Sequence, residues 1–210
     1  MNLEHLTRLT HATLMPVSPR LLRLPQSLTH LEMETSTPPQ SLPWTMPSRD
    51  LALPKLKRLA CDDFRGAACL LTRRSKNLNT ASGFADIAPL EELEIHDCGL
   101  YSCGHSIHEN LRDLHVLRLS RSTLIDDEEI AKIAQNSGSL RAVNFDQTAI
   151  TGVGVRTLVT TLKDLKHLSV CGCVSLSRDA VDWARSKGVN ITFEAGDHVS
   201  KSGRKIRWHE

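Results

Sequence analysis

Three tandem copies of one short pattern constrain this chain more than any other feature of its sequence. Written in register, the copies are LHVLRLSRSTLID, LRAVNFDQTAITG and LKHLSVCGCVSLS. Their first residues are Leu114, Leu140 and Leu165, which lie 26 and 25 residues apart. One copy of L-x-x-L-x-L is weak evidence, whereas three copies at near-constant spacing, each followed by a helical pattern, predict a repeat architecture.

The period and pattern predict an α/β leucine-rich-repeat solenoid, since repeats of that class span roughly 20 to 29 residues. Alternate residues of a strand face opposite sides, so the apolar positions point inward while Asn144 and Asp146 point outward. A small residue then packs in the turn, and a helix returns the chain. One unit cannot bury its own apolar face, so stacked units form a horseshoe with a parallel concave sheet and convex helices. The predicted inward residues of the three strands are Leu117, Leu119, Val143, Phe145, Leu168 and Val170, and the turn residues are Ser122, Thr148 and Cys173.

The chain divides into three expected regions. Residues 1–50 form irregular, Pro-rich N-terminal repeats, with strand patterns in LTRLTHATL and SLTHLEMET. Residues 51–193 form the leucine-rich-repeat domain, which includes units at LPKLKRLACDD and PLEELEIHDCGLY and ends in a strand at VNITF. Residues 194–210 form a basic C-terminal tail. Because the chain begins almost inside a repeat, without a polar cap, we expect it to be the C-terminal portion of a longer protein or a shortened gene prediction.

Helix boundaries are legible in the second half of the chain. Asp126, with Glu129 three residues later, resembles a capping box, and Gly138 is placed to end that helix. Thr151 is expected to open the next helix, and Ser177 is expected to cap the last one, which stops at Gly188. The core sides of these helices should carry Ile130, Ile133, Ala134, Val155, Leu158, Val159, Leu162, Val181 and Ala184.

The composition excludes several classes of function. A net charge of +2 is too small to predict polyanion binding, and 4% aromatic residues argue against a base-stacking surface, so we expect no nucleic-acid partner. No apolar run approaches 18 residues and no signal peptide is present, so no membrane partner is expected. Six cysteines, several at repeat positions where a thiol packs, favour a reduced protein located in the cytoplasm, the nucleus or both.

Two features resemble a known family. If the first leucine of each copy is position 1 of the repeat template, Cys98 and Cys173 occupy the ninth position, as in the cysteine-containing repeats of F-box/LRR proteins. The run TAITGVGVRTLVTTLKDLKHLSVCGCVSLSRDAVDWARSKGVNITF is similar to the C-terminal end of fungal F-box/LRR proteins. The resemblance implies the substrate-recognition part of an SCF-type ubiquitin ligase receptor, in which the repeats hold a protein substrate.

The F-box itself does not match any stretch of this chain. Neither LPQSL nor LPWTM continues into the three-helix pattern that the family uses to bind its adaptor. A Skp-type adaptor is therefore expected as a partner only if an F-box lies outside this chain. An F-box-free adaptor protein remains an alternative. A GTPase-activating LRR regulator is another, although the longer repeats of that class fit less well.

No residue pattern predicts catalysis. There is no nucleophile elbow and no Gly-rich phosphate loop after a strand, so we expect a non-enzymatic protein without a cofactor. The cluster His96, Cys98, Cys103, His105 and His108 offers nitrogen and sulfur ligands for zinc at residues 96–108, but its spacing matches no standard zinc motif. The simpler interpretation is a turn cysteine among polar surface residues. Likewise, packing is the simpler interpretation of Cys171 and Cys173, and a solvated surface that of the basic tail.

The outward strand positions form the best candidate site. Neighbouring parallel strands lie about 4.8 Å apart, so outward side chains of successive repeats form one surface. Solenoids commonly bind partners on this concave face. We expect Arg118, between an acidic and a mixed row, to anchor a protein partner, because guanidinium pairs with carboxylates and is enriched at binding hot spots. The predicted partner-binding residues are Glu94, His96, Arg118, Ser120, Asn144, Asp146 and Ser169.

Overall fold

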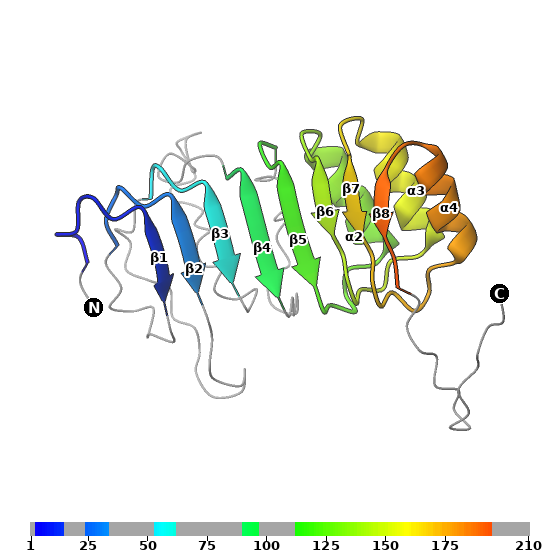
Figure 1. Cartoon of the computed structure of the whole chain (residues 1–210), viewed down its shortest axis with the longest axis horizontal. Coiled ribbons are helices and arrows are strands. Elements are labelled where there is room, and N and C mark those ends of the chain that lie inside the picture. Colours follow the sequence, from blue (N-terminus) through cyan, green and yellow to red (C-terminus); the bar gives the residue numbers. More distant parts are fainter. Residues whose placement is uncertain (1–2, 15–23, 34–52, 62–89, 97–111, 195–210) are drawn as a thin grey trace, which may run out of the picture.

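The protein is built on one open, parallel, eight-stranded sheet whose strand order follows the chain from β1 to β8 (Figure 1). The computed structural model describes residues 3–14, 24–33, 53–61, 90–96 and 112–194. The strands are β1 (His11–Leu14), β2 (His30–Met33), β3 (Arg58–Cys61), β4 (Glu92–His96), β5 (Val116–Ser120), β6 (Ala142–Asn144), β7 (His167–Ser169) and β8 (Asn190–Thr192).

Helices lie on one side of this sheet in the C-terminal half. They are α2 (Asp127–Asn136), α3 (Gly152–Thr161) and α4 (Arg178–Ser186), and each follows one of the strands β5, β6 and β7. Figure 1 shows α2 behind the strands and α3 and α4 beyond β8; we call the face of the sheet that points away from the helices the open face. A repeated strand–turn–helix unit with all strands parallel is compatible with a solenoid-like repeat fold.

The core follows directly from the alternation of each strand. Pairing aligns the fourth template position across the sheet, and this row is buried from β2 to β8: Leu31, Leu59, Leu93, Leu117, Val143, Leu168 and Ile191. The sixth position is also buried at Leu119, Phe145 and Val170. All six residues predicted to point inward are therefore in the core, and the predicted register is confirmed. Strands β1 and β2, from the Pro-rich region, belong to the same sheet.

The turn after each strand repeats its backbone conformation as well as its sequence. The eighth template position is left-handed in all three copies: φ is 58° at Arg121, 55° at Gln147 and 71° at Gly172. The next residue is the small one, and Ser122, Thr148 and Cys173 are all buried. The Thr148 hydroxyl donates to the carbonyl of Phe145 at 2.7 Å, and the Cys173 thiol donates to the same carbonyl at 3.1 Å. The predicted packing of a small residue in the turn is confirmed, and the two bonds also satisfy the Phe145 carbonyl.

The predicted helix starts are confirmed by their caps. Asp126 Oδ1 accepts from the backbone N–H groups of Glu128 and Glu129, both at 3.0 Å. Thr151 and Ser177 cap α3 and α4 in the same way. The end of α4 is also as predicted, because Gly188 follows it with a φ of 86°. Gly138 is different: it follows the C-cap Ser137 without a positive φ, so it supplies no left-handed cap.

Candidate functional site

The predicted site residues come together on the open face, in two rows of the sheet. Strand pairing places Glu94, Arg118, Asn144 and Ser169 side by side at the fifth template position. His96 pairs with Ser120 two residues further along. Arg118 therefore stands between Glu94 and Asn144, as the sequence predicted.

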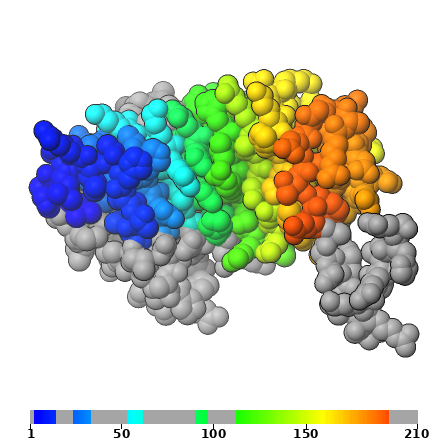
Figure 2. Space-filling view, viewed as in Figure 1, coloured from blue at the N-terminus to red at the C-terminus, as the bar shows by residue number. Residues whose placement is uncertain are grey.

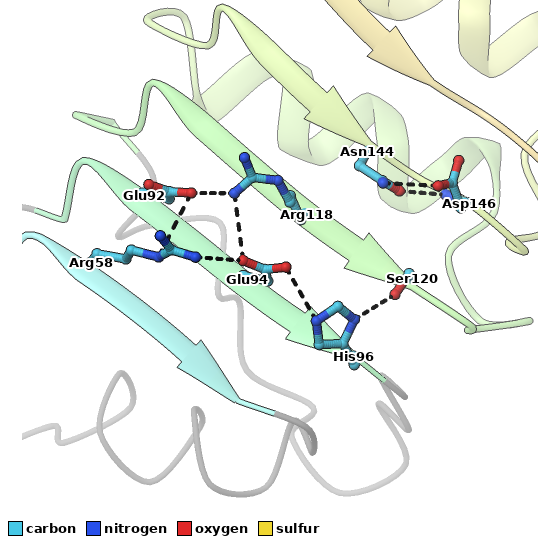
Figure 3. A network of polar contacts seen from close by, with 8 residues as sticks. All are labelled: Arg58, Glu92, Glu94, His96, Arg118, Ser120, Asn144 and Asp146. Carbon is cyan, nitrogen blue, oxygen red and sulfur yellow. Dashed lines mark hydrogen bonds and ion pairs between the residues drawn. The ribbon is translucent and has the colours of Figure 1, made fainter. Parts of the chain in front are cut away.

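Four charged residues on β3, β4 and β5 form what we call the charge network: Arg58, Glu92, Glu94 and Arg118 (Figure 3). Arg118 Nη1 contacts Glu92 Oε1 and lies 3.5 Å from Glu94 Oε2. Arg58 approaches the same two oxygens from the other side, with Nη2 3.1 Å from Glu94 Oε2 and Nε 3.8 Å from Glu92 Oε1. Each carboxylate thus contacts two guanidinium groups, one from each flanking strand.

The charge network continues through His96 toward the carboxyl ends of the strands. His96 Nε2 lies 3.1 Å from Glu94 Oε1, and its Nδ1 lies 3.1 Å from Ser120 Oγ. Both ring nitrogens are therefore occupied when Nε2–H donates to the carboxylate and the Ser120 hydroxyl donates to Nδ1. This arrangement fixes the ring orientation of a half-exposed histidine.

Arg58 and Glu92 were missed by the sequence prediction. They occupy the third template position, where pairing aligns Arg58 with Glu92. The signal was present in the sequence, because residues two before an outward position also point outward. The predicted site covers only the fifth and seventh template positions. It therefore omits the partners of Arg118 and Glu94 at the third position.

Asn144, Asp146 and Ser169 form a second group, the Asp146 cluster, beside the charge network. Asp146 Oδ1 accepts from the Ser169 hydroxyl and from the backbone N–H of Cys171, both at 2.7 Å. The Asn144 amide donates to Asp146 Oδ2 at 2.8 Å and accepts from the Asp146 backbone N–H at 2.8 Å. Among the described residues no side-chain hydrogen bond or ion pair joins this cluster to Arg118 (Figure 3). The Asp146 carboxylate therefore braces β6 against the end of β7, whatever else it contacts.

The described residues contain no group of three or more His, Cys, Asp or Glu placed to hold a metal ion. Of the zinc alternative, only His96 belongs to the described part of the chain, and Cys98, Cys103, His105 and His108 lie outside it. Cys171 and Cys173, the C-x-C pair, are free thiols. Burial raises the pKa of the Cys173 thiol above its ordinary value, in keeping with a packing role.

The open face offers charges of both signs and many hydrogen-bonding groups on a rigid sheet. Guanidinium and carboxylate groups on a surface can pair with complementary charged groups. Figure 2 shows the described strands as one continuous surface along the long axis of the molecule. None of the described helices is both long enough and apolar enough to cross a membrane.

Comparison with known proteins places the chain near one F-box protein. It is 29% identical over 181 residues to the F-box/TPR repeat protein pof3 of Schizosaccharomyces pombe. The match covers 80% of this chain but only 29% of that relative, so the chain spans about three tenths of its length. No protein-family model matches the chain. The similarity supports a relationship with F-box-type repeat proteins, which is the coarser part of the family resemblance drawn from the sequence.

Proposed function

We propose that this chain is a leucine-rich-repeat module that binds a protein on its open face and does not catalyse a reaction. The repeat class is supported by the spacing of 26 and 25 residues, by the parallel strands, and by the buried small residue in each turn. The charge network carries the binding proposal, because it projects paired charged groups from three adjacent strands.

We further propose that the module is the substrate-recognition part of an F-box-type receptor of an SCF ubiquitin ligase. The similarity to an F-box protein with repeats supports this role. The Skp-type adaptor would then bind an F-box outside this chain, and the protein would act in the cytoplasm, the nucleus or both. The seven predicted residues, joined by Arg58 and Glu92, are the proposed contact surface for the substrate.

Affinity purification tests the binding proposal. The immobilised 210-residue chain is incubated with a fungal cell extract, and captured proteins are identified by mass spectrometry. We expect Arg118→Ala to weaken capture of a specific partner by about 2 kcal/mol or more, measured afterwards with the purified partner. The control is Lys132→Ala on α2, whose ammonium forms exposed ion pairs with Glu128 and Glu129 and should contribute little.

Two results would contradict the proposal. Equal effects of Arg118→Ala and Lys132→Ala, or no effect of either, would move the site off the open face and onto the tail or the N-terminal units. A stoichiometric complex between a Skp-type adaptor and this chain alone would show that the adaptor-docking segment lies within it. In the expected result, the adaptor is not captured by this chain without an added F-box.

A further inference from the structure

The charge network has two layers, with arginine outermost. The side chains of Glu92 and Glu94 are 23% and 17% exposed, whereas those of Arg58 and Arg118 are 42% and 37% exposed. Figure 3 shows the two arginines on either side of β4, both directed at its carboxylates. The carboxylates lie closer to the sheet, and the guanidinium groups meet solvent. An approaching partner therefore reaches arginine first.

The hydrogen-bonding capacity of the two layers differs in the same direction. A guanidinium has five N–H donors in a planar fork. Arg118 contacts the carboxylates through Nη1, so its Nε and Nη2 remain without a contact among the described residues, as does Nη1 of Arg58. Glu94 is occupied at both oxygens, by the arginines at Oε2 and by His96 at Oε1. Glu92 is contacted through Oε1, which leaves its Oε2 without a contact among the described residues, so most of the uncontacted groups of the network are donors.

Glu94 fixes the spacing of the two guanidinium groups from the sheet side. Both come within hydrogen-bonding reach of one atom, Glu94 Oε2, at 3.1 and 3.5 Å. A planar carboxylate accepts hydrogen bonds at two oxygens. A partner's carboxylate placed above Arg58 and Arg118 therefore meets donors from both arginines. Two adjacent outward positions carry short side chains, Val116 on β5 and Ala142 on β6, which leave the backbone of a bound chain room to approach.

A histidine on the neighbouring strand β2, His30, is paired with Arg58 in the sheet. His30 on β2 stacks on His11 of β1, with ring centroids 4.1 Å apart. Burial, His11 and Arg58 lower the pKa of His30, and the opposing effect of Glu92 is smaller than that of Arg58.

We infer that Arg58 and Arg118 act as a two-armed clamp for a carboxylate, and that the protein bound on the open face presents an acidic segment there. This inference rests on the proposed function and adds the chemistry of the partner. Glu92 and Glu94 are positioning residues, because they hold the two forks at the spacing that a carboxylate bridges. Arg58, which the sequence prediction omitted, becomes an equal contributor to binding.

A labelled oligoglutamate peptide serves as the probe, with fluorescence anisotropy measured on the 210-residue chain at low salt. We expect binding that weakens as salt is raised. Arg58→Ala and Arg118→Ala should each weaken it by about fivefold or more, as expected for the loss of hydrogen bonds to a charged group. Arg118→Lys should recover only part of the affinity, because an ammonium lacks the planar fork. Glu94→Gln should also weaken the binding, because a neutral amide no longer draws both guanidinium groups to one oxygen atom.

Lys57→Ala is the matched control. Lys57 is adjacent to Arg58 and carries the same charge, but it pairs with Glu91 outside the network, at 2.8 Å. Its removal should change the affinity by less than about twofold if the clamp is specific. Thermal unfolding of each variant confirms that the fold is retained, and the conservative Arg118→Lys tests the clamp even if an alanine variant is unstable.

Three results would overturn the clamp. Equal losses from Lys57→Ala and Arg118→Ala would show a diffuse electrostatic attraction. Tighter binding of an oligolysine peptide than of oligoglutamate, with that binding lost in Glu94→Gln, would show that the partner is basic. Binding of a single-stranded RNA probe in preference to oligoglutamate would indicate a nucleic-acid partner instead. In each case the proposed function survives if Arg118→Ala still weakens binding of the protein captured from the extract, and it fails separately if that binding is unchanged.

Discussion

Asp127, in the first turn of α2, accepts two hydrogen bonds from Thr151, the N-cap residue of α3. The Thr151 backbone N–H donates to Asp127 Oδ1 at 2.9 Å, and its hydroxyl donates to Oδ2 at 2.5 Å. The backbone N–H of Gly154 adds a third bond to Oδ1 at 3.0 Å. One helix thus caps the next, with a carboxylate at the positive end of the α3 dipole.

We expect Asp127→Ala to lower the free energy of unfolding by about 1–3 kcal/mol, because it leaves donors at the start of α3 without their acceptor. Urea denaturation followed by circular dichroism measures the loss. Asp179→Ala is the control, since Asp179 is an exposed acid in the first turn of α4 and should contribute about 0.5 kcal/mol through the dipole. Equal losses would show that Asp127 acts only as a first-turn charge.

Gly154 is required by the close approach of α2 to α3. A Cβ at this position would lie 2.7 Å from Ile150 Cγ1 and would also overlap Asp127 Oδ1. Gly154→Ala should therefore destabilise the fold by about 1–3 kcal/mol, despite the better helix propensity of alanine. Gly138→Ala offers a matched comparison, because nothing lies within 4 Å of its Cβ and its φ is not positive. That variant should be neutral or more stable by up to about 1 kcal/mol.

Phe145 is the largest of the fully buried side chains and is completely inaccessible. Phe145→Ala should cost about 3–5 kcal/mol as a core truncation. Val153→Ala, at a side chain that is 65% exposed, should stay within about 0.5 kcal/mol of the wild type. Chemical denaturation of both variants checks the comparison, and a loss below about 1 kcal/mol for Phe145→Ala would contradict the register of the sheet.

Acidification should weaken the N-terminal end of the sheet through His30. Burial first, then the charges of His11, Arg58 and Lys57, lower the pKa of His30, and Glu92 opposes them. The unfolded chain therefore binds a proton at higher pH than the folded chain does. The stability contributed by neutral His30 is present above the unfolded pKa of about 6.5 and is lost as the pH falls toward the lower folded value.

Thermal unfolding between about pH 7.5 and pH 5 measures this dependence around the unfolded histidine pKa. We expect His30→Gln to show a shallower decline than the wild type, because glutamine retains a polar side chain beside Thr29 but does not titrate. His167→Gln, on the same face at β7, serves as the comparison for a histidine outside the stack. An unchanged slope in His30→Gln would show that other groups control the acid response.

The sequence predicted the elements that periodicity determines. Leu117, Val143 and Leu168 lie in the core because an alternation of two fixes which side chains face inward. The helix starts at Asp126, Thr151 and Ser177 followed from cap chemistry that acts within a few residues. Such patterns are local, so a single sequence contains them.

Relations between repeats were less visible in the sequence. The cap from Asp127 to α3 spans 24 residues and depends on how closely two helices pack. Of the three copies, only the third carries glycine, Gly172, at the left-handed turn position. The residue types of Arg121 and Gln147 therefore did not indicate a left-handed conformation. In the site, alternation gave the face of Arg118 but not its rotamer, which turns it toward β4 and away from the Asp146 cluster.

The order of the strands also determines how the molecule would respond to tension. Each strand bonds only to those immediately before and after it in the chain, from β1 to β8. A pull on the two ends of the described sheet therefore loads the outermost ladder first, and its hydrogen bonds open in succession, as in a zipper. Extension would proceed one repeat at a time, and the repeats still folded would keep their part of the open face.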